Sequence, residues 1–522
     1  MQKKQLYTVF IIIGIISIFG CSWFHKKPTA KVVIIGGALA DKINPILVSE
    51  SALTAIDANI FDGLIQTNDQ MEIIPHLAER WVYSSDRKEL VIHLRQGVKF
   101  HDGVELTADD VKFTYDAIMR PDIGSYLSTE FTAVDRIEID GKYRIRIFFK
   151  EPNVNFLYTM RIGILPKHCL TIDSLKQPDL PFHHHPIGTG PFSVEKWDDG
   201  TITLTANQEY FGGKPKIDRV IVRSFPNQSV MWSQLMTDQI NVTEDILPAD
   251  YKVLLTNPKI KAYKTPARYY FMVLLNSRNP LFSDIKVRQA LNYAIDRQAI
   301  IDELFLGEGS IAKSIFPPDS YITNRTLQGY DYQPRKAMQL LAESGWKMDK
   351  KTRQLMKKGY PFEFTLLIDQ DNTLKRQIAS ILDQELQELG IKLRLHSMPV
   401  SSLVNGYLLP KRFDACIAEM DSLYEANFGY VFYHSEQIRN GFNVESYQNP
   451  KVDHLYNQLQ LVEDPELKKK LFDALQMEII QNPPGILLFY PHRLAGVSNK
   501  YVNVKPRSND NILWNLRDWD RI

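Results

Sequence analysis

The stretch from 95 to 119, RQGVKFHDGVELTADDVKFTYDAIM, predicts a strand, a tight turn and a helix. His101-Asp102-Gly103 is typical of a turn, because Asp and Gly tolerate positive φ. Thr107 is expected to cap the helix, with Asp110 three residues later as the acidic variant of a capping box. The helix should bury one apolar face, formed at helical spacing by Val111, Tyr115 and Ile118.

The residue sequence of this stretch closely resembles the signature of the family 5 extracellular solute-binding proteins, the dipeptide- and oligopeptide-binding proteins of bacterial ABC importers. That family has "KFHDG", then "TADDV", then a helix. Two further phrases are similar to the family: GTGPF at 188–192, and NPLFSDIKVRQALNYAIDRQAII at 279–301. In the second phrase we expect Arg288 and Arg297 to fix the helix against its neighbours. The resemblance extends over essentially the whole mature chain.

Length and composition leave room for two or three domains. The chain has 522 residues, with 44% hydrophobic and 24% charged residues, which is ordinary for a globular protein. The formal net charge is +1, so no broad basic field indicates nucleic-acid binding. Three cysteines (21, 169 and 416) form neither a disulfide framework nor a CxxC metal motif.

The N-terminus has the pattern of a secretory signal. Lys3 and Lys4 precede an apolar run that is too short for an ordinary transmembrane helix, and the run ends in Ile-Phe-Gly-Cys21, which looks like a bacterial lipobox. We therefore expect residues 1–20 to be a signal peptide, Cys21 to carry lipid, and residues 21–31 to form a tether. An ordinary signal peptide or a short anchor helix is the alternative.

The mixture of helical and strand patterns predicts an α/β protein with more than one lobe. The resemblance implies a two-lobed periplasmic-binding-protein type II fold with an additional domain and a hinge of two chain crossings. The implied ranges are 32–56, 186–270 and 478–522 for a discontinuous lobe I, 57–185 for the additional domain, and 271–477 for lobe II. The implied crossings lie near 269–275 and 487–490.

The resemblance also implies a ligand-binding carboxylate. In this family an Asp after a Gly-Trp pair holds the α-amino group of the ligand, and counting back from Phe428 places Asp421 at that position. An ammonium removed from water requires such a charge partner. We expect its neighbours Glu419 and Met420 to belong to the site. A solvated loop Asp is the alternative, since Ile-Ala replaces Gly-Trp and Glu-Ala replaces the usual Asp-Pro.

Other candidate ligand contacts lie on the facing lobe and at the crossings. Val48-Ser49-Glu50-Ser51 resembles the family segment that pairs with the peptide main chain, a form of strand addition. A polar surface loop is the alternative for this segment. Tyr269, Tyr270 and Tyr490 lie at the two expected crossings, where tyrosines either line the cleft or pack in the core.

Metal and enzyme classes find little support. His183-His184-His185 is a tandem triplet whose neighbouring side chains diverge, so three imidazoles do not easily reach one ion. The GTGPF phrase lacks the third glycine of a nucleotide-binding loop. The chain has no GxSxG elbow, no HExxH helix and no Walker loop, so we expect no enzyme, no cofactor and no bound metal.

The resemblance thus implies a lipid-anchored, extracytoplasmic component of an ABC importer that binds short peptides between its lobes. It would act as a monomer and deliver peptides to permease transmembrane subunits. Two alternatives stay open: a carrier of a nickel complex or haem, and a surface lipoprotein that keeps the fold without transport. The residues give no peptide length, no side-chain preference and no permease partner.

Overall fold

The computed structural model describes residues 30–39, 41–47, 51–69, 72–198, 200–244, 246–421, 426–507 and 511–522. The predicted signal peptide 1–20, the lipidation candidate Cys21 and nearly all of the tether lie outside these residues. The candidates Val48, Ser49 and Glu50 also lie outside them. Among the residues that the structure covers, no helix is both long and apolar enough to cross a membrane.

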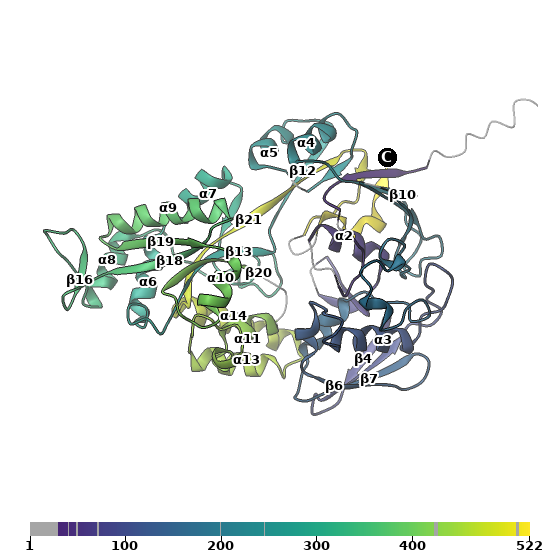
Figure 1. The fold of residues 1–522 in the computed structure, drawn as a ribbon, viewed down its shortest axis with the longest axis horizontal. Helices are drawn as coiled ribbons and strands as arrows, with labels where there is room; N and C mark the ends of the chain where they lie inside the picture. The colour runs from purple at the N-terminus through teal and green to yellow at the C-terminus, as the bar shows by residue number, and fades with distance from the viewer. Residues whose placement is uncertain are drawn as a thin grey trace, which may run out of the picture.

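The fold is of the α/β class and has two lobes and an additional domain (Figure 1). A 12-stranded sheet runs through both lobes in the order β19-β18-β20-β13-β21-β11-β1-β10-β9-β8, with β12 and β14 paired to β21. The type II architecture expected from the sequence is therefore confirmed. The domain boundaries given above stay predictions.

Lobe I consists of strands around β1, which is parallel to β10 and β11, and of short helices. Its elements are β1 (Val32–Gly36), α2 (Ser51–Ile60), β8 (Phe192–Asp198), β9 (Thr201–Ala206), β10 (Arg219–Arg223), α4 (Gln228–Met236), β11 (Val242–Thr243), α5 (Pro248–Leu254), β12 (Ile260–Pro266), β22 (Tyr501–Val502), η6 (Ile512–Asp518) and β23 (Asp520–Arg521).

The additional domain carries a four-stranded sheet in the order β4-β5-β7-β6. Its elements are β2 (Ile65–Thr67), β3 (Ile73–Pro75), β4 (Ala78–Tyr83), β5 (Glu89–Leu94), α3 (Ala108–Met119), η1 (Ser128–Phe131), β6 (Val134–Ile139), β7 (Arg144–Phe149), η2 (Asn155–Arg161), η3 (Ser174–Lys176) and η4 (Pro181–His183).

The signature stretch folds as its residues predict. Gly103 has φ +90°, which an L side chain rarely adopts, and α3 begins after Thr107. The backbone N–H of Thr107 donates to Asp110 Oδ2 at 2.8 Å, so the capping box is formed. The predicted apolar face is fully buried.

Lobe II is a three-layer arrangement in which helices cover both faces of the mixed sheet (Figure 1). Its elements are β13 (Tyr269–Leu275), α6 (Ile285–Ala294), α7 (Arg297–Phe305), β14 (Gly309–Ile311), α8 (Pro334–Glu343), β15 (Lys347–Met348), β16 (Leu355–Lys357), β17 (Tyr360–Pro361), β18 (Glu363–Asp369), α9 (Thr373–Glu388), β19 (Lys392–Met398), α10 (Val400–Ser402), the π-helix η5 (Leu403–Leu408), β20 (Ala415–Asp421), α11 (Ala426–Tyr433), α12 (Gln437–Asn440), α13 (Pro450–Leu459) and α14 (Pro465–Gln481).

One long strand, β21 (Gly485–Ser498), belongs to both lobes. Its first half pairs with β13, and its second half pairs with β12 and β11. The chain changes lobes near Pro491, whose carbonyl accepts a 2.7 Å hydrogen bond from the backbone N–H of Ala267. We call β13 and β21 the crossing strands.

Two buried arginines fasten helices of lobe II to the segment around β21. The Arg297 guanidinium donates to the carbonyls of Leu487 at 2.6 Å and Asn292 at 2.8 Å. Arg288 donates to the carbonyl of Pro483 at 2.7 Å and to that of Phe282 at 2.6 Å. Since buried polar groups need partners, these bonds fix the helices against the strand, as predicted.

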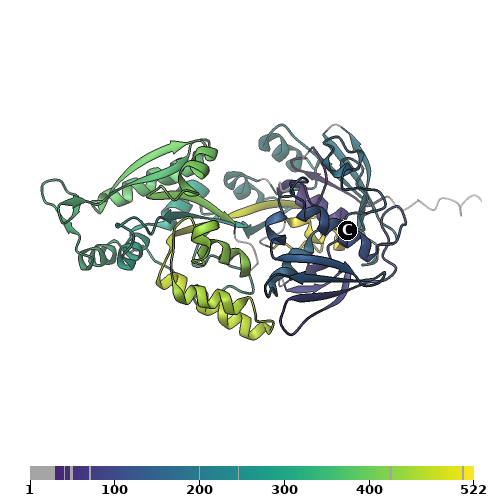
Figure 2. The same cartoon turned by 60° about the horizontal axis from the view of Figure 1, so that its bottom comes forward.

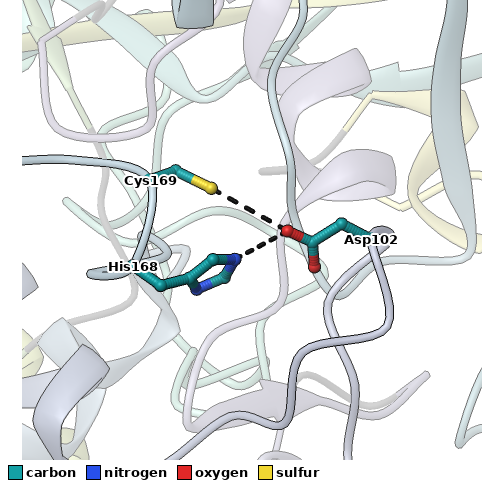
Figure 3. A group of neighbouring side chains, drawn as sticks. All are labelled: Asp102, His168 and Cys169. Atoms are coloured by element: carbon teal, nitrogen blue, oxygen red, sulfur yellow. Dashed lines mark hydrogen bonds and ion pairs between the residues drawn. The ribbon is translucent and has the colours of Figure 1, made fainter.

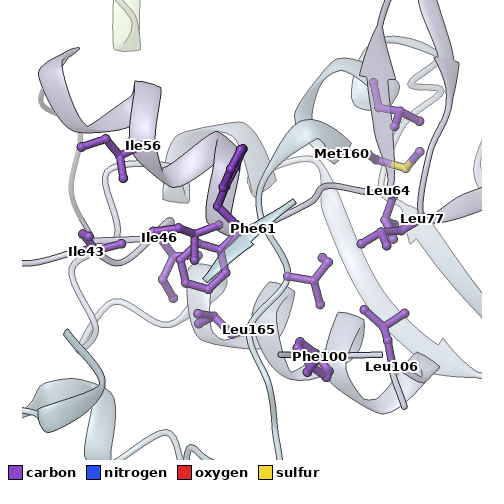
Figure 4. Packing of buried hydrophobic residues seen from close by; sticks show 14 of the residues in the cluster. Ile43, Ile46, Ile56, Phe61, Leu64, Leu77, Phe100, Leu106, Met160 and Leu165 are labelled. Carbon is purple, nitrogen blue, oxygen red and sulfur yellow. The ribbon is translucent and has the colours of Figure 1, made fainter. Parts of the chain in front are cut away.

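Lobe I and the additional domain share a single hydrophobic core (Figure 4). That core joins residues of β1, β8, β9 and β10 to residues of β4–β7 and α3. The GTGPF phrase links the two parts: the backbone N–H of His101 in the additional domain donates to the Gly188 carbonyl at 2.9 Å, and a Cβ on Gly188 or Gly190 would lie 2.6 Å or less from the Ile60 backbone of α2. Only glycine permits that close approach. Lobe I and the additional domain therefore behave as one packed unit.

Candidate functional site

The predicted carboxylate, Asp421, is the last residue of β20 and lies where the sheet reaches the lobe crossing. Asp421 is opposite Tyr269 in the register of β20 with β13. Its Oδ2 lies 3.1 Å from a guanidinium nitrogen of Arg268, which comes from the link between β12 and β13. Both side chains are about one-third exposed (39% for Arg268 and 33% for Asp421). The carboxylate thus already faces one cation.

The two residues before Asp421 lie on opposite faces of the strand, as strand alternation requires. Glu419 Oε1 accepts a 3.0 Å hydrogen bond from Asn372 and lies 3.3 Å from Lys375 Nζ, at the start of α9. Met420 is buried on the other face, in the cluster that contains Tyr270. Met420 and Asp421 both line one pocket, while Glu419 bonds to the start of α9.

The three predicted tyrosines occupy different environments. Tyr490 is fully buried, and its hydroxyl donates to the Ser314 carbonyl at 3.2 Å. Tyr270 is buried beside it, with ring centroids 5.3 Å apart, and its hydroxyl lies 3.0 Å from that of Tyr433. Tyr269 is 38% exposed. Of the three, Tyr269 is the one whose side chain presents a substantial surface.

Tyr269 also marks where the two lobes approach each other. Burial raises the pKa of its hydroxyl, the Glu419 carboxylate raises it further, and the Arg493 guanidinium lowers it. Glu419 belongs to lobe II and Arg493 to the lobe I half of β21. Charged groups of both lobes therefore lie close enough to the Tyr269 hydroxyl to shift its pKa.

Two small pockets flank this point. The pocket in lobe II has a volume of about 10 Å³ and is lined by Tyr270, Ile315, Phe316, Met420, Asp421, Gly429, Phe432 and Tyr433. The pocket in lobe I, also about 10 Å³, is lined by Glu244, Tyr263, Lys264, Thr265, Arg493, Ala495, Pro506, Arg507 and Ile512. A volume of this size holds about one water molecule. Each pocket joins charged side chains to an apolar wall.

Ser51 is the first residue of α2, so the predicted peptide-pairing segment leads into that helix. Its pairing role and the ligand role of Asp421 stay predictions. Sequence reasoning missed Arg268 and Arg493, because neither lies in a recognisable motif. The signal that was available is their position beside the two crossings, within three residues of Tyr269 and Tyr490.

The histidine triplet diverges, as expected for neighbouring residues. His183 is buried, and burial lowers the pKa of its ring. His184 is exposed and packs against Trp197, with ring centroids 4.8 Å apart. His185 is also exposed. The three rings therefore lie in separate surroundings.

Away from the crossing, lobe II touches the additional domain through a set of polar contacts that we call the interlobe contact. The hydroxyls of Tyr158 and Tyr321 lie 2.8 Å apart. Lys468 Nζ donates to Asn155 Oδ1 at 3.1 Å. The third pair is an ion pair of 3.1 Å between Arg87 and Glu463. Figure 2 shows α14 reaching the additional domain.

Comparison with known proteins places these features in context. Residues 72–438 match the family described as bacterial extracellular solute-binding proteins, family 5 middle. The oligopeptide-binding protein AppA of Bacillus subtilis is 30% identical over 504 residues, covering 94% of this chain and 92% of AppA. Heme-binding protein A of Haemophilus influenzae is 26% identical over 473 residues, covering 85% of this chain and 84% of that protein.

Solved structures show the same likeness. The structure of B. subtilis AppA in complex with a nonapeptide superposes with a TM-score of 0.71 at 28% identity, covering 94% of this chain and 99% of AppA. The structure of NikZ from Campylobacter jejuni in complex with Ni(L-His) superposes with a TM-score of 0.73 at 26% identity, with the same coverage of 94% and 99%.

Proposed function

This chain belongs to the bacterial extracellular solute-binding proteins of family 5, and we propose that it binds short peptides between its two lobes for an ABC importer. The observation that carries the proposal is the likeness to oligopeptide-binding protein AppA over 94% of the chain. A likeness of that extent covers both lobes, the crossing strands and the additional domain.

The proposed contacts follow from the geometry at the crossing. Asp421 would hold the α-amino group of the peptide, Met420 and Glu419 would flank it, and Tyr269 would cover the main chain. The segment 48–51 would pair with the peptide backbone from lobe I. Tyr270 and Tyr490 would support this surface from the core. Closure would favour the liganded state, because a peptide between the lobes contacts both of them.

Arg268 gives the proposal a specific form. Its guanidinium pairs with Asp421, so an incoming ammonium would compete with it or share the carboxylate. Arg268 lies in the link between β12 and β13, which would bend if the lobes moved about the crossing strands. Exchange of Arg268 for the peptide amine would therefore couple ligand binding to movement at the crossing.

The decisive experiment measures peptide affinity by calorimetry in a double-mutant design. The protein and its Asp421→Asn variant are each titrated with a free peptide and with its N-acetylated form. A charge-assisted hydrogen bond contributes about 1.5–3 kcal/mol, so we expect a loss of roughly 10- to 150-fold in affinity for the free peptide. Acetylation should cost the native protein a similar factor and the variant almost nothing further.

The matched control is Asp135→Asn, which removes an exposed carboxylate paired with Arg136 at the same 3.1 Å. This variant should bind as the native protein does. If Asp421→Asn keeps full affinity, or if acetylation weakens both proteins equally, the amine role of Asp421 is wrong.

A second candidate function is transport of a metal complex or haem. It is favoured by the structural likeness to NikZ, which was solved with Ni(L-His), and by the likeness to Heme-binding protein A. Mass spectrometry and metal analysis of what co-purifies with the native protein distinguish the two. A ladder of short peptides supports the first function, whereas nickel or haem supports the second. No bound compound and no response to defined di- to pentapeptides would favour a surface lipoprotein without transport.

We further propose that Cys21 carries the lipid anchor, that the protein works as a monomer outside the cytoplasm, and that its closed form docks on permease transmembrane subunits. The lipobox-like sequence before Cys21 supports the anchor. Metabolic labelling with a radioactive fatty acid tests it: a Cys21→Ser variant should lose the label and leave the membrane fraction.

A further inference from the structure

A cluster of three metal-ligating side chains lies on the additional domain, in the turns beside the signature helix (Figure 3). Asp102 Oδ2 lies 2.6 Å from His168 Nε2 and 3.8 Å from Cys169 Sγ. The candidate ligand atoms of all three residues lie within 4.8 Å of one another. Asp102 comes from the turn before α3, while His168 and Cys169 come from a turn 66 residues later.

Local structure explains how two adjacent residues reach one point. In an extended segment neighbouring side chains diverge, as the histidine triplet does. The segment 166–169 is instead a tight turn, closed by a 3.1 Å hydrogen bond from the backbone N–H of Cys169 to the Pro166 carbonyl. The turn brings the imidazole and the thiol to the same side, and both face the same carboxylate oxygen in Figure 3.

The cluster is held in place from both ends. The backbone N–H of Lys167 donates to Asp110 Oδ1 at 2.9 Å, which ties the turn 166–169 to the first turn of α3. Asp102 Oδ1 accepts a 3.2 Å bond from the backbone N–H of Val104, so Oδ2 is directed toward His168 and Cys169. All three residues are exposed at the surface, so an ion from solution has access.

From this arrangement we propose that Asp102, His168 and Cys169 bind a zinc ion, with water as the fourth ligand. Nitrogen, sulfur and carboxylate oxygen are the ligands that Zn²⁺ takes in proteins, commonly four in a tetrahedron. Tetrahedral bond lengths of about 2.0–2.3 Å require ligand atoms roughly 3.3–3.6 Å apart. The nitrogen–oxygen and oxygen–sulfur distances of 2.6 and 3.8 Å bracket that separation. Small side-chain rotations therefore complete the site.

The site would tie the additional domain to lobe I. His101, in the same turn as Asp102, lies 3.0 Å from the Gly190 carbonyl through Nε2, and its Nδ1 accepts a 3.2 Å bond from the Gly188 N–H. An ion on Asp102 would fix that turn to the segment 166–169 and, through His101, to the GTGPF phrase. The site is distinct from the proposed peptide site at Asp421, and its presence does not depend on what the cleft binds.

The first test is titration of the purified, metal-free protein with Co²⁺ under reducing, oxygen-free conditions, followed by competition with Zn²⁺. We expect one Co²⁺ per chain, a thiolate charge-transfer band and the visible bands of tetrahedral Co²⁺, all abolished by Zn²⁺. The variants Cys169→Ser, His168→Gln and Asp102→Asn should each lose at least about tenfold in affinity, and Cys169→Ser should lose the charge-transfer band. Their circular dichroism should match the native protein, because the side chains are exposed.

The controls separate this site from other thiols, histidines and carboxylates. Cys416→Ser removes the buried thiol, His184→Gln together with His185→Gln removes the exposed part of the triplet, and Asp421→Asn alters the proposed peptide site. All three should bind Co²⁺ as the native protein does. Zn²⁺ should raise the thermal midpoint by about 2–4 °C in the native protein and not in Cys169→Ser. Absence of the thiolate band in the native protein, or its survival in Cys169→Ser, would overturn the proposal.

Discussion

Lobe II meets the rest of the molecule in two regions of opposite character. At the crossing strands the contact between neighbouring strands is apolar and lies on the lobe II side of Pro491: Phe271 and Phe489 pack with ring centroids 5.1 Å apart, and Tyr270 packs on the fully buried Tyr490. At the interlobe contact it consists of single polar pairs, such as Tyr158 with Tyr321 and Lys468 with Asn155.

The difference indicates which region stays and which opens. Separating apolar side chains that pack in a core costs several kcal/mol of free energy. A hydrogen bond that water can replace contributes only about 1 kcal/mol. Because lobe I and the additional domain share one core, lobe II would move against both of them together, about the crossing strands. The interlobe contact is then the part that forms and breaks.

The largest expected effect is that of Tyr490→Ala at the crossing. This change leaves a cavity beside Tyr270 and removes the hydrogen bond to the Ser314 carbonyl. Large aromatic-to-alanine changes in cores cost about 3–5 kcal/mol, and we expect a loss of that size in the free energy of unfolding. Urea unfolding followed by tryptophan fluorescence measures it.

Tyr490→Phe is the control for that experiment and also addresses the ligand role of Tyr490. It keeps the ring and loses the hydroxyl bond, so the cost should be about 1 kcal/mol. Peptide affinity should not change, because Tyr490 is enclosed by the core. A tenfold weaker affinity in Tyr490→Phe would instead mean that the hydroxyl reaches the ligand.

The next effect concerns a carboxyl group that is buried beside the apolar crossing strands. Glu445 is buried near Gly485, at the start of β21, and burial raises the pKa of its carboxyl from 4.5 to about 8. The folded protein therefore holds this proton more tightly than the unfolded chain does. Stability from this group is fully present below pH 4.5 and is lost as the pH rises toward 8.

Glu445→Gln keeps a neutral group at every pH and should remove this loss. Its stability relative to the native protein should grow by up to about 1.4 kcal/mol per pH unit between pH 5 and 8. Urea unfolding at four pH values in that range measures the trend. Glu151→Gln, at a surface position that is 83% exposed, is the control and should run parallel to the native protein. If the stability of Glu445→Gln also changes with pH in parallel with that of the native protein, burial does not raise the pKa of Glu445.

Local sequence predicted those parts of the fold whose interacting residues lie close together in the chain. Thr107 and Asp110 predicted their capping box because both partners lie within one helical turn. The resemblance implied a chain crossing near residues 487–490, but the strand there, β21, runs from Gly485 to Ser498. Pro491, His492 and Arg493 interrupt the apolar run, and the pairing that continues the strand comes from β12, more than 200 residues earlier in the chain. No local pattern carries that information.

The same limit applies to the sites. Family resemblance pointed to Asp421, but the carboxylate's partner Arg268 became evident only when the register of β13 with β20 was known. The residues His168 and Cys169 carry no motif, since their third partner, Asp102, lies in a distant turn. The tandem histidines drew attention through spacing alone, and the fold separates them. Side chains that meet across long loops are the ones that sequence spacing does not reveal.

The smallest expected effect is a pH dependence of the interlobe contact. Burial against the additional domain lowers the pKa of the Lys468 ammonium from 10.5 to about 8. Below pH 8 the contact must bury a charge, so it is weakest there, and it gains strength as the pH rises from 8 toward 10.5. We expect small-angle X-ray scattering of the ligand-free protein to show more of the compact form at pH 10 than at pH 7.

Lys468→Met should abolish that difference, because methionine carries no charge to bury. Lys469→Met is the matched control: it removes the adjacent lysine, which pairs with Asp473 on the same helix, and should retain the native response. If Lys468→Met and the native protein expand equally at pH 7, the charge on Lys468 does not govern the contact. If instead the variant is compact at both pH 7 and pH 10, the buried charge of Lys468 is what favours the open form in the native protein. The interlobe contact, and not the crossing strands, then sets the balance between open and closed forms.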